Sequence, residues 1–273
     1  MTQTSLIAFQ GAPGAYSDLA CREVFPDRAT LGFETFEDTI AAVRDGRAEL
    51  AMLPIENSVA GRVADIHHLM PNSGLAIIGE HFQRVNHHLL ALPGATLEGL
   101  KTVRSHIQAL SQCRSLIRKR GLAAQVAADT AGSAAEVAQR SDKTVAAIAS
   151  ELAGRIYGLV SLAENIEDEE HNTTRFLIAA PAPRPLPSGC GKAVTTFVFR
   201  VRNVPAALYK ALGGFATNGV NMTKLESYML GGRFTATQFY ADVEGRPEDG
   251  PLSRALEELR FFSHEVKILG TYP

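Results

Sequence analysis

Short apolar runs alternate with amphipathic helical patterns between Leu6 and Tyr157. Strands that are separated by helices form largely parallel sheets, because a parallel connection needs a crossover that is normally a helix. The pattern occurs in two blocks, so we predict an α/β fold with two lobes and a cleft between them for a small ligand. The expected elements are Leu6–Phe9, Ser17–Phe25, Thr35–Arg44, Leu50–Pro54, Asn86–Leu92, Ser105–Arg120, Gln125–Ala127, Ser133–Arg140, Val145–Ile148 and Ser150–Tyr157.

A stretch rich in proline and glycine, Ala179–Lys192, divides the chain. Proline fixes φ and lacks a backbone N–H, so this stretch cannot continue a helix or an inner strand. The part that follows reads strand, helix, strand, strand, helix, strand, with a two-residue turn at Gly231-Gly232. This order predicts a ferredoxin-like βαββαβ sheet, whose exposed edges favour pairing with another copy. We expect a first domain over residues 1–180, a linker over 181–192 and a second domain over 193–273.

Charge and cysteine content exclude several classes of function. The 273-residue chain has 27 Lys and Arg, 29 Asp and Glu and a net charge of −2, which predicts no nucleic-acid partner and no anionic-membrane partner. Its three cysteines are too few and too far apart for a disulfide framework or a zinc site, which indicates a cytoplasmic location. We see neither a signal-peptide pattern nor an apolar run of the ~20 residues that span a membrane.

Several turns of small residues lie directly before the start of a predicted helix. The unpaired N–H groups and the dipole at such helix starts favour carboxylates or phosphates. Ordinary capping explains some of them equally well, since two match the S/T-x-x-E/Q capping box, Ser105 with Gln108 and Ser133 with Glu136. We expect a small anion rather than a nucleotide, because neither a P-loop nor a G-x-G-x-x-G turn is present. The segments are Gly11–Ser17, Pro54–Gly61, Ser105–Gln108 and Asp129–Ala134.

Two polar segments are candidates for chemistry. Glu56-Asn57-Ser58 directly follows a predicted buried strand, where the glutamate could act as acid or base and the asparagine as a donor to an oxyanion. Alternatively, Asn57 or Ser58 caps the next helix and Glu56 faces water. The second segment is Asn172–Phe176, in which Arg175 could bind a carboxylate or pair with the acidic run Glu167–Glu170.

Strand alternation limits what the second segment can do. In an extended backbone Thr174 and Phe176 face one side and Arg175 the other, so Thr174 and Arg175 share a site only if the backbone is irregular. The histidines lack H-E-x-x-H spacing, and no G-x-S-x-G elbow is present. These patterns predict neither a metal site nor a serine hydrolase, and Cys113 is expected in the core.

Taken together, these segments resemble prephenate dehydratase, and the resemblance covers essentially the whole chain. The resemblance implies a bilobal, periplasmic-binding-protein-like catalytic domain followed by a ferredoxin-like ACT regulatory domain. The catalytic motifs are Gly11–Ser17 with Ala20, Pro54–Ser58 with Gly61, Ser105-His106 with Gln108–Leu110, Thr130-Ala131, and Asn172 with Thr174–Phe176. The ACT motifs are Asn203–Leu208, Gly219–Thr223 and Leu225–Ser227.

The activity that this resemblance implies is the decarboxylative dehydration of prephenate to phenylpyruvate, CO₂ and water in L-phenylalanine biosynthesis, without a cofactor. Arogenate dehydration at the same site is an alternative, since one sequence does not separate the two. Solute-binding proteins share the bilobal architecture, so a non-catalytic binding protein is a further alternative, as is a regulatory sensor built on the tail. The resemblance also implies a homodimer or homotetramer that pairs through the ACT domain and binds L-phenylalanine as effector.

The resemblance also assigns residues. Thr174 is the expected catalytic residue, giving a hydrogen bond to the departing oxygen, and Glu56 is the alternative proton donor. The chain departs from the family at Ala206, where glycine is usual, at Tyr228-Met229, where Arg-Pro is usual, and at Ile107, where proline is common. The expected substrate-binding residues are Asn57, Ser58, Gly61, Ser105, His106, Gln108, Thr130, Ala131, Asn172, Arg175 and Phe176. The expected effector-binding residues are Asn203, Ala207, Leu208, Asn221, Met222, Thr223, Glu226 and Ser227.

Overall fold

The computed structural model describes residues 5–202, 204–229 and 236–273. The chain forms two compact units, which we call unit 1 (Met1–Ile66 with His81–Leu177) and unit 2 (His67–Glu80 with Ile178–Pro273). Among the helices in the described residues, none has both the length and the hydropathy needed to cross a membrane.

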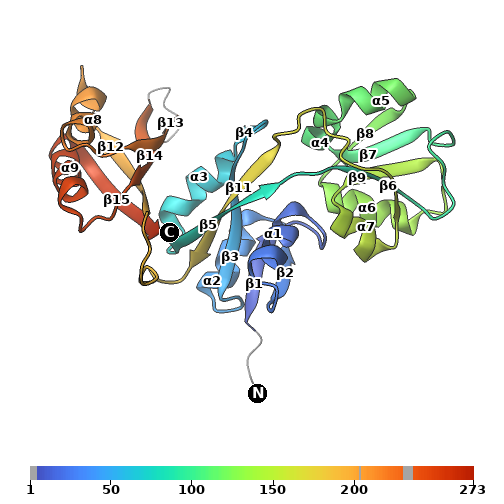
Figure 1. Ribbon diagram of the computed structural model, residues 1–273, viewed down its shortest axis with the longest axis horizontal. Helices are drawn as coiled ribbons and strands as arrows, with labels where there is room; N and C mark the ends of the chain where they lie inside the picture. The colour runs from blue at the N-terminus through green and yellow to red at the C-terminus, as the bar shows by residue number, and fades with distance from the viewer. Residues whose placement is uncertain (1–4, 203, 230–235) are drawn as a thin grey trace. The chain divides into compact units, whose positions relative to one another are not determined.

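The first half of unit 1, which we call lobe A, is built on parallel strands. β1 pairs in parallel with β2 on one side and β3 on the other, and β11 lies next to β3 (Figure 1). The second helix has a side-chain cap, since Thr35 accepts a hydrogen bond from the backbone N–H of Asp38. The elements are β1 (Leu6–Gln10), α1 (Tyr16–Val24), β2 (Ala29–Phe33), α2 (Phe36–Arg44), β3 (Leu50–Asn57), β4 (Gly61–Arg62) and β11 (Thr173–Ala180).

The other half, lobe B, contains a second sheet with strand order β10-β6-β9-β7-β8. Helices α4 and α5 lie on one face of this sheet and α6 and α7 on the other (Figure 1). The predicted α/β class with two sheets is therefore confirmed. The elements are β6 (His88–Ala91), β7 (Thr102–His106), α4 (Ile107–Gln112), α5 (Arg114–Arg120), β8 (Ala123–Ala127), α6 (Thr130–Gln139), β9 (Val145–Ala149), α7 (Glu151–Tyr157) and β10 (Val160–Ala163).

Two predicted capping boxes in lobe B are wrong. Ser105 lies within β7, and its buried hydroxyl donates to the carbonyl of Ile148, so it cannot cap a helix. His106 takes the cap position instead, and the expected helix over 105–120 is interrupted at Cys113, between α4 and α5. α6 begins three residues earlier than predicted, because the Asp129 carboxylate accepts the N–H of Gly132 and places Ser133 inside the helix.

Unit 2 contains the predicted ferredoxin-like sheet. Its strands pair antiparallel in the order β13-β14-β12-β15, and α8 and α9 pack together over a core of Phe, Leu, Val and Ala side chains. The turn predicted at Gly231-Gly232 lies outside the described residues. The elements are β12 (Val194–Val201), α8 (Ala207–Thr217), β13 (Met222–Met229), β14 (Ala236–Glu244), α9 (Gly250–Phe262) and β15 (Ser263–Tyr272).

A segment from much earlier in the chain also belongs to unit 2. The His67 ring lies edge-on to Tyr240, with 5.0 Å between ring centroids, and Lys267 donates to the carbonyl of Pro71 at 2.6 Å. A Cβ on Gly270 would come within 2.0 Å of the Ile77 carbonyl oxygen, so only glycine permits this approach. The segment contains the end of α3 (Ala64–Leu69), the short helix Met70–Asn72 and the start of β5 (Ala76–Arg84).

Ala206 has left-handed backbone angles (φ 59°, ψ 14°) at the start of α8, a conformation that glycine adopts without the Cβ clash that alanine meets. We expect Ala206→Gly to stabilise the protein by about 1 kcal/mol, because glycine removes the clash between Cβ and backbone. Thermal unfolding checks this as a rise in Tm of about 2–4 °C. The control is Ala216→Gly at an exposed position within α8, which should lower Tm because glycine weakens a helix interior. A fall in Tm for both variants would contradict the prediction.

Candidate active site

Unit 1 contains a cavity of about 490 Å³, a size typical of small-molecule sites. Its wall combines the ends of lobe A strands with the first turns of helices from both lobes. Because these segments are far apart in the sequence, the cavity exists only when both lobes are folded. Lobe A and the segments that connect it to lobe B contribute Gln10, Gly11, Ala15–Ser17, Phe36, Pro54, Asn57, Ala60–Asp65, Val85, His87, Thr174 and Phe176. Lobe B contributes His106, Gln108, Ala109, Gln112 and Ala128–Thr130.

The structure brings about half of the expected site residues to this wall. Among the expected residues that do not line it, most lie directly beside one that does, as Ser105 does beside His106 and Ala131 beside Thr130. Those that line the cavity are Asn57, Gly61, His106, Gln108, Thr130, Thr174 and Phe176. Those that do not are Glu56, Ser58, Ser105, Ala131, Asn172 and Arg175.

Asn57 binds the Thr174 hydroxyl directly. Its Oδ1 accepts hydrogen bonds from the backbone N–H groups of Val59 (3.0 Å) and Ala60 (2.8 Å), which shapes the turn between β3 and β4. Its Nδ2 donates to Thr174 Oγ1 at 2.9 Å and to Asn172 Oδ1 at 2.8 Å. The alternative that Asn57 caps the next helix is therefore wrong, since its side-chain oxygen is used within the turn.

Glu56 and Arg175 form an ion pair instead of facing the cavity. Arg175 Nη1 lies 3.0 Å from Glu56 Oε1, and only 10% of the Arg175 side chain is exposed. Because Arg175 sits between two residues that do line the wall, Thr174 and Phe176, the strand alternation predicted from the sequence is observed. The charges of the guanidinium and the carboxylate therefore neutralise each other beside the site. The alternative in which Glu56 faces only water is wrong.

Ser58 holds the chain just before Thr174. Its hydroxyl donates to the carbonyl of His171 at 2.7 Å and accepts from the backbone N–H of Thr173 at 2.9 Å. Its own backbone N–H donates to the Thr173 carbonyl at 2.8 Å. Ser58 therefore ties the β3–β4 turn to the start of β11, and it does not cap a helix.

Sequence reasoning assigned no role to the polar side chains of Tyr16, Arg62, His87 and Gln112, which all line the cavity. His87 Nε2 lies 2.9 Å from Gln112 Oε1, and His87 Nδ1 lies 2.9 Å from the Tyr16 hydroxyl. Burial lowers the pKa of His87 and raises the pKa of Tyr16 well above its ordinary value. One local signal could have found Gln112: it lies four residues after Gln108 and so on the same face of α4.

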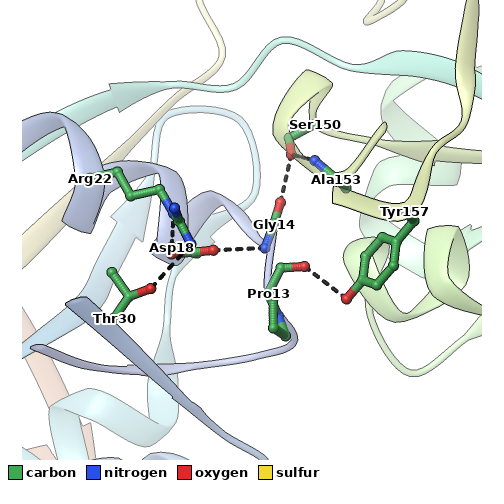
Figure 2. A network of polar contacts seen from close by, with 8 residues as sticks. All are labelled: Pro13, Gly14, Asp18, Arg22, Thr30, Ser150, Ala153 and Tyr157. Carbon is green, nitrogen blue, oxygen red and sulfur yellow. Dashed lines mark hydrogen bonds and ion pairs between the residues drawn. The ribbon is translucent and has the colours of Figure 1, made fainter. Parts of the chain in front are cut away.

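The turn between β1 and α1 is held by the start of α7, as Figure 2 shows. Ser150 Oγ donates to the Gly14 carbonyl at 2.6 Å and also accepts the N–H of Ala153, capping α7. The Tyr157 hydroxyl donates to the Pro13 carbonyl at 3.0 Å. A Cβ on Gly14 would lie 2.7 Å from the Ala153 Cα, so glycine is required for this contact between lobes A and B. The contact positions the adjoining residues of the cavity wall.

Within the described residues, no group of three or more histidine, cysteine, aspartate or glutamate side chains could hold a metal ion. Cys113 lies in the core of lobe B, as predicted. Burial raises the pKa of the Cys113 and Cys21 thiols, which keeps both protonated.

Comparison with known proteins gives consistent results. Residues 7–183 match the family model described as prephenate dehydratase. The chain is 57% identical to a "Bifunctional N-acyl-homoserine lactone acylase/prephenate dehydratase" of Komagataeibacter europaeus, covering 100% of this chain and 97% of the relative. It is 37% identical to "Arogenate dehydratase/prephenate dehydratase 2, chloroplastic" of Arabidopsis thaliana, covering 98% and 72%. The solved structure of prephenate dehydratase from Arthrobacter aurescens in complex with L-Phe is 30% identical, with a TM-score of 0.89 over 98% of this chain and 89% of that chain.

Proposed function

Because this chain belongs to the prephenate dehydratase family, we propose that its cavity converts prephenate to phenylpyruvate. The prephenate dianion and one proton give the phenylpyruvate anion, CO₂ and water. Forming the aromatic ring drives the reaction, so the protein has to hold the dianion in one orientation and help the ring hydroxyl leave. The observation that carries the proposal is the Thr174 hydroxyl at the cavity wall, held at 2.9 Å by Asn57.

In this proposal Thr174 donates a hydrogen bond to the departing oxygen. A threonine hydroxyl is a far weaker acid than a carboxylic acid, so it shares its proton without fully transferring it. The Asn57 N–H, which points at Thr174 Oγ1, stabilises the negative charge that develops there. Glu56 is bound to Arg175 and does not line the cavity, which favours a supporting role for it over proton donation.

The two carboxylates of the substrate need positive potential. The first turns of α1 and α6 lie at the wall, and their N–H groups and dipoles favour anions. Arg62 also lines the wall, and we propose that it takes the role that Arg175 was expected to fill. His106 and Gln108 lie on the lobe B side and can donate to the same anion.

Arogenate is the alternative substrate, since relatives are named for either compound or both. It differs from prephenate by an ammonium group in place of the keto group. Asp65 and Asp129 at the cavity wall could pair with that group, although Asp129 already caps α6. The preference for one substrate is therefore decided where the cavity holds the keto or ammonium group. The dehydration chemistry at the ring is the same for both.

We further propose that L-phenylalanine binds unit 2 and regulates the enzyme, as the L-Phe complex of the Arthrobacter protein suggests. Ala207 and Leu208 begin α8, and the expected effector residues from Asn221 to Ser227 lie on β13 or just before it. The side chains of Asn221, Thr223 and Ser227 are exposed, so a second copy of the chain could cover them and complete a pocket. Asn203 lies outside the described residues.

One observation favours a second activity, the hydrolysis of N-acyl-homoserine lactones. The Komagataeibacter relative named as both acylase and dehydratase is 57% identical over the whole of this chain. By comparison, the chain is only 37% identical to the plant relative whose name gives dehydratase activities alone. We propose this acylase activity as a second candidate for the same protein.

Purified protein tests these proposals with prephenate, arogenate and an N-acyl-homoserine lactone, each with and without L-phenylalanine. We expect prephenate to give phenylpyruvate and CO₂ in equal amounts, with a higher kcat/KM than arogenate, because Arg62 and the helix N-termini at the wall favour the more negative substrate. We expect L-phenylalanine to bind in isothermal titration and to change the rate. Failure to turn over either ring substrate would overturn the main proposal. Binding of L-phenylalanine without any change in rate would overturn the regulatory proposal alone.

A further inference from the structure

We propose that a chain of hydrogen bonds with a fixed donor and acceptor at every link connects His87 through Gln112, Asn172 and Asn57 to Thr174, and that Gln112 is a positioning residue for the Thr174 hydroxyl. The proposal rests on the proposed function in one respect, which is that Thr174 contacts the substrate. The donor and acceptor assignment itself follows from geometry.

The donor and acceptor roles along the chain of hydrogen bonds are fixed at Asn57. Backbone N–H groups can only donate, and two of them, from Val59 and Ala60, point at one end of the Asn57 amide. That end must be the oxygen. The Asn57 NH₂ group therefore faces Asn172 and Thr174 and donates one hydrogen to each, at 2.8 and 2.9 Å.

The assignment then passes from one side chain to the next. Asn172 receives a hydrogen bond on Oδ1, so its NH₂ group faces Gln112 and donates to Gln112 Oε1 at 2.9 Å. His87 Nε2 lies 2.9 Å from the same oxygen. An amide oxygen carries no hydrogen, so His87 must be protonated at Nε2. Gln112 Oε1 thus accepts two hydrogen bonds, one from each side.

The surroundings of His87 fit this assignment. Burial lowers the pKa of His87, which favours a neutral ring, and the contact with Gln112 Oε1 places the single proton on Nε2. The Tyr16 hydroxyl has one proton, and burial raises its pKa so that the proton is kept. The hydroxyl donates this proton to the Asn86 carbonyl at 2.6 Å, so the bare Nδ1 at 2.9 Å can only share it in a three-centre hydrogen bond. Glu167 accepts the backbone N–H of His87 at 2.8 Å. The hydrogen bond to Gln112 and the charge of Glu167 act against burial and raise the His87 pKa, whereas His88 lowers it further.

The consequence for Thr174 is a hydroxyl with a defined orientation. Its oxygen accepts from Asn57, and no residue in the described parts of the chain accepts its proton. The proton is therefore available to a group in the cavity that Thr174 lines. Gln112 belongs to α4 in lobe B, whereas Asn57 and Thr174 belong to lobe A strands. Gln112 holds the Asn172 amide, whose oxygen binds the second hydrogen of the Asn57 NH₂ group, so contact between the lobes helps to keep in place the Asn57 amide that binds Thr174.

Two variants of Gln112 separate positioning from direct substrate binding. Gln112→Leu removes the acceptor, so we expect kcat to fall by about 10- to 100-fold with little change in KM. Gln112→Glu keeps an oxygen that accepts from both neighbours, so kcat should stay at least about 10-fold above that of the leucine variant. Its negative charge faces a dianionic substrate, and KM should therefore rise. An unchanged kcat in Gln112→Leu, or an equal loss of kcat in both variants, would overturn the proposal.

A second measurement does not depend on turnover. ¹⁵N NMR of the wild-type imidazoles should show His87 protonated at Nε2 and not at Nδ1, with a slowly exchanging proton, and Gln112→Leu should speed that exchange. A proton on Nδ1 alone would overturn the assignment even in an active enzyme. If instead the wild type shows the Nε2 proton but turns over neither prephenate nor arogenate, the hydrogen-bond chain stands and the proposed function fails.

Discussion

Replacing Thr174 by valine is expected to lower kcat for prephenate by about 10²- to 10³-fold, since valine keeps the shape of threonine and removes the hydroxyl that we propose binds the departing oxygen. The loss should appear in kcat and not in KM, because the hydrogen bond matters most once negative charge develops. Thr174→Ala should behave similarly, and Thr174→Ser should retain part of the activity. Steady-state kinetics of phenylpyruvate formation measures these effects.

The adjacent threonine provides a matched control. Thr173 does not line the cavity, and its hydrogen bonds to Ser58 use only its backbone N–H and carbonyl. Thr173→Val makes the same chemical change one position away, so its kcat should stay close to the wild-type value. Circular dichroism and Tm show whether each variant is folded. Near-normal activity in a folded Thr174→Ala protein would refute the role of this hydroxyl.

Gly14→Ala is expected to disrupt the contact between the β1–α1 turn and α7. The added Cβ would lie 2.7 Å from the Ala153 Cα, and the left-handed φ of 90° adds backbone strain. We expect a loss of about 3 kcal/mol in the free energy of unfolding. We also expect a fall of about 10²-fold in kcat/KM, because the turn carries residues of the cavity wall. Denaturant unfolding and steady-state kinetics measure the two effects.

Gly46→Ala separates the steric contact from the backbone strain. Gly46 has a similarly positive φ of 75°, but a Cβ added there would have no atom within 4 Å. This variant should lose only about 1 kcal/mol and keep its kcat/KM. Equal losses in the two variants would show that strain alone accounts for the effect, and that the contact with α7 does not position the site.

The helices and strands of both units follow from sequence patterns that extend over only a few residues. Alternating strand and helix patterns predicted the two sheets of unit 1, and the βαββαβ order predicted the sheet of unit 2. The Thr35 cap of α2 and the end of α8 at Asn218 and Gly219 are local features of the same kind, since caps and turns depend on local backbone chemistry. Strand alternation also anticipated that Thr174 and Arg175 face different sides.

Which polar groups meet was decided only by tertiary structure. Asn57 and Thr174 are 117 positions apart, and Asn172 and Gln112 are 60 apart. Local patterns carry no information about such partners, so Glu56 and Arg175 were expected to act separately and His87, Gln112 and Arg62 were missed. The capping boxes failed for a related reason: the Ser105 hydroxyl finds the buried Ile148 carbonyl, and satisfying a buried polar group outweighs a local sequence preference. Periodicity thus determined the elements of this protein, whereas the packing of its two lobes determined which side chains can act together.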